Sequence, residues 1–559
     1  MNQPLLQHFD LLATAPGGVA RLRELILTLA VRGKLVPQDP ADEPSSVLLQ
    51  KIRAEKDRLI AEGKIKRDKP LPLITDEEKP FELPQGWEWV RLNAMLQKIG
   101  AGSTPRGGKE VYVTSGVKFL RSQNVWDDGL RLAGVAFIRP ETHAKMSGTV
   151  VVADDLLFNI TGASIGRCAV VPSDFDEANV SQHVTIVRSV LPAINAFLHK
   201  VLVSQHVQQA VMAAQVGVSR EGLSIAKLGN FLIPVPPLAE QSRIVARVEE
   251  LMRLCDALET KGKLDAAQHT QLVQTLLGTL TDSAGPEELA ANWLRVAEHF
   301  DLLLDRPENV DALEQTLLQL AVRGLLVPQD PSDEPASVLL QKIRAEKDRL
   351  IAAGKIKRDK PLAPITDEEK PFELPAGWEC VRLADVIRVL NGRAYSKQEL
   401  LEAGPTPVLR VGNLFTSKHW YYSDLALEPE KYCLEGDLLY AWSASFGPFI
   451  WRGPKAIYHY HIWKLEPWAA QHFDAGYFHK FLDEKTAEIK AAGHGVSMVH
   501  MTKEKMEKIV VPFPPLQEQS RIVARVEQLR QLCAELRQRL TASRATQGQL
   551  AQALVETAL

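Results

Sequence analysis

Basic and small polar residues gather in short segments of this chain, several of them rich in glycine, where their side chains could contact nucleic acid. Arginine pairs with guanine, asparagine or glutamine with adenine, and serine or threonine with either base. Glycine in such segments lets the backbone approach a phosphate group. The candidate DNA-binding residues are Arg106, Lys109, Arg121, Gln123, Asn124, Thr161, Ser164, Arg167, Gln182, His183, Ser219, Arg220, Arg393, Tyr395, Lys397, Arg410, Asn413, Trp442, Ser443, Ser445, His461, Ser497 and His500.

Residue patterns that would indicate catalysis are missing from the sequence. It contains no glycine-rich phosphate loop ending in Gly-Lys-Ser or Gly-Lys-Thr, and neither Asn-Pro-Pro nor Asp-Pro-Pro. His183, His459 and His461 could suggest a metal site, but no matching cluster of carboxylates or thiols accompanies them. We therefore expect a non-catalytic chain that holds neither a cofactor nor a metal ion.

A tandem duplication organises the elements that must position these candidates. Residues 29–92 recur at 320–383 with 8 differences in 64 positions, and residues 236–258 recur at 514–536. We call these repeated blocks the frame. Each copy of the frame encloses a segment that differs between the two halves of the chain.

The two variable segments, at about 93–233 and 384–511, share little identity, yet their landmarks correspond. This indicates one fold in two versions, with mixed strand and helix patterns, and the run 194–214 predicts a single helix. Polar loops are common, but here they occur at matched positions with different chemistry, as two sites for different DNA sequences would. The corresponding landmarks are Arg121 and Asn124 with Arg410 and Asn413, and His183 with His461.

The frame is nearly identical in its two copies, whereas the variable segments are not. A duplication that simply drifted would diverge everywhere. We therefore infer that the frame contacts the same partner twice and that the variable segments contact two different ligands. A recent recombination that joined one frame to two inserts would give the same pattern, and it stays open as an alternative.

Long helices are expected to hold the variable segments apart. After the proline pairs at 236–237 and 514–515, apolar residues alternate at spacings of four and three, which is typical of a coiled-coil seam. We expect the two seams to pack on each other as an intramolecular antiparallel coiled coil about a pseudo-twofold axis, with the first helix broken near Gly262. The seams are Ile244, Val248, Leu251, Cys255 and Leu258, and Ile522, Val526, Leu529, Cys533, Leu536 and Leu540.

Charge and composition limit the location and the kind of DNA site. The 559 residues include 66 Lys+Arg and 69 Asp+Glu, for a net charge of −3. Residues 86–235 carry 14 basic and 11 acidic residues and residues 377–513 carry 16 of each, so a DNA site must be a local stripe. Five scattered cysteines, no signal pattern and no run near the roughly 20 apolar residues of a membrane span predict a cytoplasmic protein without a membrane partner.

Several motifs together resemble the specificity subunit of type I restriction–modification systems, over nearly the whole chain. They are FELPQGWEWVRL at 81–92, GDLLY at 436–440, the GVS triplets at 217–219 and 495–497, and IPVPPLAEQSRIVARVE at 233–249 with its second copy. The helix that opens with PPL-x-EQ-x-x-IV after each variable segment is the most specific of these signals.

The resemblance implies an α+β fold with two α/β target recognition domains, each reading one half of a split, asymmetric site on double-stranded DNA. It implies that the long helices set the spacer and dock two modification subunits, and that two ATP-dependent restriction subunits join the complex. S-adenosylmethionine, ATP and magnesium would bind to those partners. The corresponding regions are 1–85, 86–235 (first recognition domain), 236–376, 377–513 (second recognition domain) and 514–559.

Two other functions stay open. One is a non-catalytic assembly scaffold whose variable domains bind proteins. The other is an enzyme with an unfamiliar site.

Overall fold

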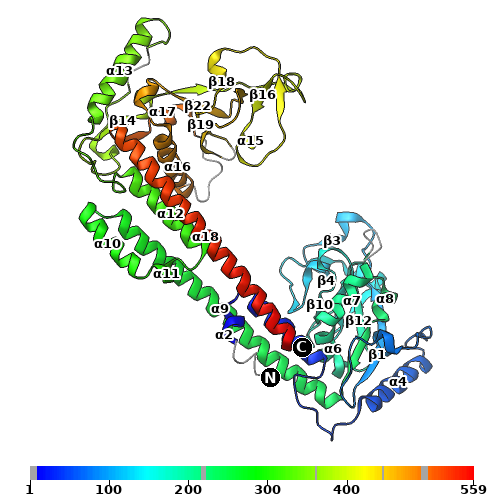
Figure 1. The fold of residues 1–559 in the computed structure, drawn as a ribbon. Coiled ribbons are helices and arrows are strands. Elements are labelled where there is room, and N and C mark those ends of the chain that lie inside the picture. Colours follow the sequence, from blue (N-terminus) through cyan, green and yellow to red (C-terminus); the bar gives the residue numbers. More distant parts are fainter. Residues whose placement is uncertain (1–8, 216–221, 359–361, 444–445, 493–500, 559) are drawn as a thin grey trace. The chain divides into compact units, whose positions relative to one another are not determined.

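Two long helices, α9 (Leu238–Thr281) and α18 (Leu516–Ala558), follow the two variable segments. The computed structural model describes residues 9–215, 222–358, 362–443, 446–492 and 501–558. The chain divides into a first unit, up to residue 264 and from 544 onward, and a second unit, 265–543 (Figure 1). The expected break near Gly262 is wrong, because α9 runs through this glycine without interruption. A helical glycine costs about 1 kcal/mol, which the remaining turns of a long helix can offset.

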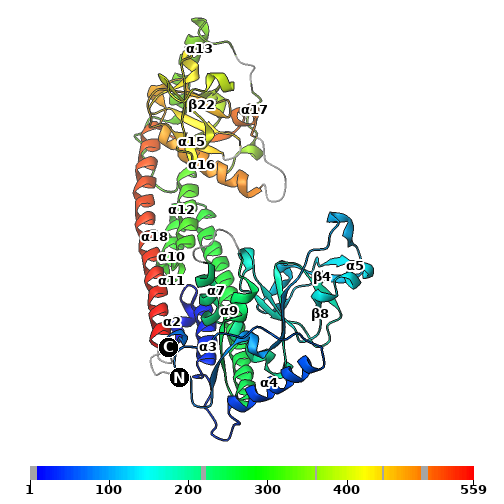
Figure 2. The same ribbon diagram turned by 90° about the vertical axis from the view of Figure 1, so that its right-hand side faces the viewer.

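The apolar seams of these helices lie in separate cores. In the first unit, Ile244, Val248 and Cys255 of α9 are buried with residues of α3 (Gly18–Val31) and with Ala551 and Val555 of α18. Figure 2 shows the ribbons of these three helices close together. Both long helices thus contribute to this core, as the prediction of paired helices requires. The expectation that the two seams face each other is wrong, since a third helix, α3, lies against the seam of α9.

The second unit repeats this arrangement. Cys533 of α18 is buried in one core with Val273 and Leu277 of α9 and with Leu313 of α12 (Pro307–Val322). The beginning of α18 therefore meets the end of α9 here, while the end of α18 meets the beginning of α9 in the first unit. This order of contacts is that of an antiparallel pair, as expected.

The first variable segment forms an α+β domain. The strands β1 (Glu88–Arg91) and β13 (Leu232–Val235) pair antiparallel where the segment begins and ends. Between them lie a four-stranded antiparallel sheet in the order β10-β9-β12-β2 and a five-stranded sheet in the order β3-β7-β4-β11-β8, in which β4 and β11 run parallel. The strands are β2 (Leu96–Ala101), β3 (Tyr112–Val113), β4 (Val117–Leu120), β7 (Ala136–Ile138), β8 (Val150–Val151), β9 (Leu156–Asn159), β10 (Cys168–Val170), β11 (Ala178–Val180) and β12 (Val184–Ser189), and a separate hairpin joins β5 (Val125–Trp126) to β6 (Gly129–Leu130).

The second variable segment has the same topology except that, among the described strands, β3 and the β5–β6 hairpin have no counterpart, which supports the prediction of one fold in two versions. The pair β14–β23 replaces β1–β13, and the sheets have the orders β15-β22-β19-β20 and β17-β16-β21-β18, with β16 and β21 parallel. The strands are β14 (Glu379–Arg382), β15 (Ile387–Asn391), β16 (Thr406–Leu409), β17 (Tyr421–Ser423), β18 (Tyr432–Cys433), β19 (Leu438–Ala441), β20 (Gly447–Ile450), β21 (Ala456–Tyr458), β22 (Ile462–Pro467) and β23 (Val510–Phe513).

Helices cover the sheets and build the rest of each unit. The predicted helix over 194–214 is instead two, because the chain turns at Val203 and Ser204, whose side-chain hydroxyl bonds the Val201 carbonyl at 2.6 Å. The remaining helices are α2 (Phe9–Thr14), α4 (Ser45–Ala61), α5 (Pro140–Lys145), α6 (Asn195–Leu202), α7 (Gln205–Gln215) and α8 (Ile225–Gly229) in the first unit, and α10 (Pro286–Glu298), α11 (Phe300–Leu303), α13 (Ala336–Ala352), α14 (Leu383–Val386), α15 (Val411–Phe415), α16 (Ala475–Ala492) and α17 (Lys503–Glu507) in the second.

A buried glutamate joins each variable domain to its long helix. Glu240, 1% exposed, accepts the Trp87 indole N–H at 3.0 Å and the Gln38 amide at 3.2 Å. In the second unit, Glu518 accepts Trp378 at 3.0 Å and Gln329 at 3.1 Å. Burial raises the pKa of both carboxyls. Part of the identity between the frame copies therefore has an internal cause and needs no partner.

Candidate nucleic-acid interface

Parallel strand pairs bring the landmark residues of each variable domain to one edge. β4 ends before Arg121 and β11 before Ser181, whose N–H donates to the Leu120 carbonyl at 2.9 Å. In the second unit, His459 after β21 donates its N–H to Leu409 of β16, also at 2.9 Å. Because parallel strands end at the same edge of a sheet, residues about 50 to 60 positions apart meet there.

Three loops of the first unit meet at this edge. The Thr161 hydroxyl lies 2.6 Å from Nδ1 of His183, which joins the β9–β10 loop to the β11–β12 loop. The buried Asn159 amide donates to the Ser122 carbonyl at 2.9 Å and to the Ser164 hydroxyl at 3.2 Å. The structure thus joins the loop that carries Thr161 and Ser164 to His183 and to Ser122, which lie in other sequence segments.

Trp126 lies between two guanidinium groups. The Cζ atom of Arg131 is 3.6 Å from the centroid of the Trp126 ring, and that of Arg167 is 3.7 Å from it. Two guanidinium carbons so close to one centroid cannot share a face without overlap, so the cations lie on opposite faces. The Trp126 indole N–H donates to the Gln123 carbonyl at 2.8 Å, which fixes the ring between them.

Two aspartates lie beside this stacked pair. Arg131 forms an ion pair with the exposed Asp128 at 3.3 Å. Asp127 interacts electrostatically with Arg167 and accepts the Cys168 N–H at 3.0 Å. Two neighbouring cations on one ring suit an anionic ligand, and stacking leaves the guanidinium N–H groups available in their plane.

Asn124 does not have the exposure that base reading requires. It is 1% exposed, its carbonyl accepts the Arg121 N–H at 2.9 Å, and its amide donates to the Arg131 carbonyl at 2.8 Å. Asn413 makes the same turn, accepting the Arg410 N–H at 3.1 Å. In this structure the Asn124 side chain therefore holds the Arg121 turn in place and is not turned toward a ligand.

The other first-unit candidates divide by exposure. Arg106, Gln123 and Gln182 are exposed, and Arg121 is half-buried. The buried Nε of Arg121 has no hydrogen-bond partner within the part of the chain that the structure describes. Ser219 and Arg220 lie outside the described residues, and so does the side chain of Lys109.

A small hollow marks the corresponding edge of the second unit. It has a volume of about 320 Å³, and Arg410, His459 and His461 line it together with Tyr421. Arg410 lies over the Tyr421 ring at 5.3 Å. Burial and, to a smaller extent, the charges of His461 and Arg410 lower the pKa of His459 to about 4, so this imidazole is neutral at physiological pH.

Aromatic side chains continue this edge. Trp442 stacks on Trp463 at 5.6 Å and donates its indole N–H to the Tyr460 carbonyl at 2.9 Å. Arg393 pairs with Glu399 at 2.6 Å and lies over the Tyr395 ring at 5.3 Å. Its charge is therefore partly compensated within the protein.

Among the described residues, no hydrogen bond joins the remaining second-unit candidates to this cluster. Lys397 is exposed and Ser443 is half-buried. Ser445, Ser497 and His500 lie outside the described residues.

The sequence did not identify Trp126, Arg131, Tyr421 and His459 as parts of these edges. A usable signal was present for the first two, because Trp126 and Arg131 flank a short Asp-Asp-Gly turn directly after the candidate Asn124. His459 lies two residues before the candidate His461 and was noted with it only as a possible metal ligand. Tyr421 had no comparable signal, since only the strand pairing brings it beside Arg410.

Within the described ranges, no three His, Cys, Asp or Glu side chains are grouped so that they could hold a metal ion. No helix among the same residues has the length and apolar character needed to cross a membrane.

Comparisons with known proteins agree on one family. The family described as type I restriction modification DNA specificity domain matches residues 84–268 and 375–543. The specificity subunit of the type I restriction enzyme EcoAI of Escherichia coli is 37% identical over 97% of this chain and 94% of its own length. That of EcoEI, also from Escherichia coli, is 34% identical over the same shares. The solved HsdS subunit from Thermoanaerobacter tengcongensis has 20% identity over 86% of this chain and 98% of its own, with a TM-score of 0.40.

Proposed function

This chain belongs to the type I restriction–modification specificity subunits, and we propose that each of its variable domains reads one half of a bipartite, asymmetric DNA site. Like its relatives, it is the non-catalytic, DNA-recognising member of a restriction–modification complex. We place the two recognition domains at 86–235 and 377–513. The pairs β1–β13 and β14–β23, which join the two ends of each domain, support these limits.

The observation that carries this proposal is the matched edge with different chemistry. In each domain, one strand of a parallel pair ends directly before a matched arginine, which is Arg121 in the first domain and Arg410 in the second. The neighbours then differ: a Trp126 cation stack lies in the first domain, and the Tyr421 and His459 ring cluster in the second. One scaffold with two such edges suits two different base sequences.

Arginines at these edges supply both affinity and specificity. Guanidinium groups attract phosphates, and a planar guanidinium can form two hydrogen bonds to guanine. The stack on Trp126 limits the rotation of Arg131 and Arg167, so less entropy is lost when they bind. A protein-binding scaffold explains this stacked pair of cations less well.

Partner subunits supply the chemistry. We propose that two modification subunits dock on the frame, that two restriction subunits join them, and that S-adenosylmethionine, ATP and magnesium bind to those partners. Since the target is genomic or invading DNA, we place the complex in the cytoplasm. The contribution of this chain is to hold the partners at a defined distance from two recognised half-sites.

A DNA-binding titration of the chain with its modification subunits tests this function. We expect nanomolar binding to one bipartite duplex. A duplex with either half-site scrambled should bind at least about 10³-fold more weakly. Equal affinity for all duplexes, together with tight protein binding by the variable domains, would favour the scaffold instead.

A further inference from the structure

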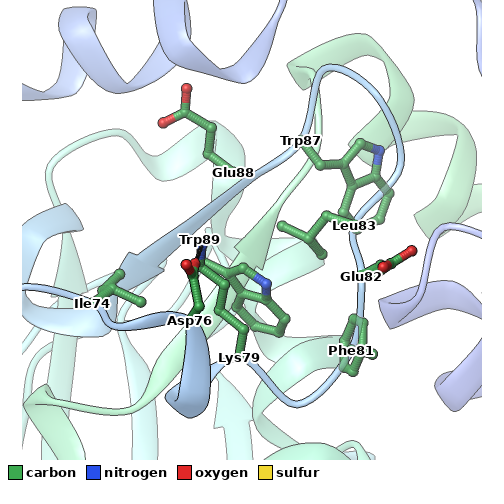
Figure 3. Close-up of a pocket in the computed structure, with 9 residues that line it drawn as sticks. All are labelled: Ile74, Asp76, Lys79, Phe81, Glu82, Leu83, Trp87, Glu88 and Trp89. Carbon is green, nitrogen blue, oxygen red and sulfur yellow. Dashed lines mark hydrogen bonds and ion pairs between the residues drawn. The ribbon is translucent and has the colours of Figure 1, made fainter.

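An open groove occurs at the same place in both copies of the frame. The first, of about 850 Å³, lies between β1 and the preceding segment, and Figure 3 shows its lining side chains. The second, of about 660 Å³, lies beside β14. The nine residues around the first groove are Ile74, Asp76, Lys79, Phe81, Glu82, Leu83, Trp87, Glu88 and Trp89, and the second copy has the same residue at eight of these positions.

Internal contacts do not account for this identity. Trp87 and its counterpart Trp378 have buried partners, but the side chains of Glu82 and Glu88 are exposed and form no hydrogen bond or ion pair with any residue that the structure describes. The same holds for Glu373 and Glu379. These exposed carboxylates have no internal partner, so they are available to an external one.

The groove also borders an open strand edge. β1 pairs only with β13 and β14 only with β23 among the described strands, so the outer edge of each two-stranded sheet lacks a partner. Open edges accept an extended peptide through main-chain hydrogen bonds, and side-chain pockets then select its residues.

Charge indicates the chemistry of that peptide. Asp76, Glu82 and Glu88 line the first groove against the single cation Lys79, which already pairs with Asp76 at 2.5 Å. The carboxylates left over favour a basic segment. Phe81 and Trp89, with ring centroids 4.9 Å apart, add an aromatic surface on which lysine or arginine stems can pack.

We propose that each groove binds an extended, basic segment of one modification subunit, added as a strand to the edge of β1 or β14. This inference rests on the proposed function for the identity of the partner, whereas the place and chemistry of docking come from the grooves. Two copies of one groove would hold two copies of one partner.

Among the nine positions around the first groove, the two copies differ only where Trp89 is replaced by Cys380. The second groove is lined by as many cations as carboxylates, which favours a basic peptide less: Arg344, Lys370 and Arg382 against Glu373, Glu379 and Asp385. Docking is therefore stronger at the first groove than at the second, and the two partner copies bind with unequal affinities.

Charge reversal in each groove tests this docking. The chain and variants Glu82→Lys and Glu373→Lys are titrated with the purified modification subunit, with the groove peptides followed by hydrogen exchange. We expect slowed exchange over 74–89 and 365–380 in the complex, and about tenfold weaker binding of one partner copy in each variant. The matched controls Glu77→Lys and Glu368→Lys change the same charge on neighbouring exposed residues that do not line the grooves.

The outcomes separate the two proposals. If the wild-type chain binds two modification subunits but neither groove gains protection, or if the groove variants bind like their controls, the groove assignment is overturned and the proposed function stands. If the wild-type chain binds no modification subunit, the partner itself is wrong, and the occupant of the grooves is wrong with it.

Discussion

The guanidinium of Arg167 lies over the indole of Trp126, with its Cζ atom 3.7 Å from the ring centroid. Arg131 occupies the opposite face, so a single tryptophan orients two cations at the edge of the first recognition domain. We propose that this pair reads the first half-site, whereas at the Tyr421 cluster of the second domain Arg410 lies over the ring at 5.3 Å.

Replacing Trp126 with leucine removes the surface that orients both arginines. Each cation–π contact contributes about 0.5–2 kcal/mol, so we expect binding to the complete site to weaken by roughly two- to thirtyfold per contact. Discrimination at guanine positions of the first half-site falls as well. Binding titrations with single-base variants of both half-sites measure this effect, and the second half-site is the internal control. Equal loss of discrimination in both halves would contradict the assignment.

Asn124 holds a turn, so its replacement should lower stability and leave base preference unchanged. Asn124→Ala removes two buried backbone contacts, and we expect a loss of about 1–3 kcal/mol in the free energy of unfolding. The exposed neighbour Gln123 is the matched control, because Gln123→Ala should change unfolding by about 0.5 kcal/mol or less. Denaturant unfolding of both variants measures the difference, and equal stabilities would argue against a structural role for Asn124.

The hydrogen bond from Trp87 to Glu240 should give a pH-dependent penalty when it is removed. Burial raises the pKa of Glu240, so its stabilising contribution is full below the unfolded pKa of about 4.5 and is lost as pH rises through the folded value. The indole N–H offsets part of this loss by bonding the ionised carboxylate. Trp87→Phe should therefore cost about 1.5–3 kcal/mol at pH 7.5 and less near pH 4.5.

Denaturant unfolding of Trp87→Phe across this pH range tests whether the loss of stability is larger at high pH. Trp378→Phe, which removes the bond to Glu518, provides the parallel measurement in the second unit. A penalty that grows as pH falls would contradict the account.

The buried imidazole of His199 should make the protein less stable in acid. It is 6% exposed, its Nε2 lies 2.9 Å from the Cys168 carbonyl, and burial, with the charge of Lys200, lowers its pKa to about 4. The contribution of His199 to the free energy of unfolding is full above the pKa of about 6.5 that the imidazole has in the unfolded chain. As pH drops toward 4, this contribution falls by about 3 kcal/mol in all. His199→Gln should flatten the stability profile between pH 7 and 4.5, whereas the exposed control His299→Gln should not. Identical profiles for the two variants would contradict this role.

The sequence predicted local elements well where their patterns were strong. The duplicated helices α4 and α13 and the strands around Leu157 and Ile186 follow apolar periodicity that is readable from the chain alone. The expected break at Gly262 failed because a long helix tolerates one exposed glycine. The expected seam-to-seam contact failed because periodicity shows that a helix has an apolar face and not which helix covers it.

The candidate site was predicted at the level of loops and not of individual contacts. Arg167 and His183 were found by residue type, but the parallel pairing of β4 with β11 decides what surrounds them. Asn124 has the residue type of a base reader and the environment of a turn. Only its 1% exposure distinguishes the two roles.

The spacing role of α9 and α18 can be tested by lengthening both. One heptad inserted in α9 after Gly262, where neighbouring residues are exposed, and one between residues 541 and 545 of α18 should leave both half-sites unchanged and alter the spacer between them. Methylation mapping in cells that express the variant with its modification subunit measures the spacer. An unchanged spacer would contradict the role of these helices as a ruler.

The most direct test of two independent readers is a genome-wide map of methylated bases after residues 93–233 are replaced by the corresponding segment of another family member. The chain is expressed with its modification subunit, and long-read sequencing gives the methylated motif before and after the exchange. The account predicts a bipartite motif in which only one half changes. A single contiguous motif, or a change in both halves, would contradict it.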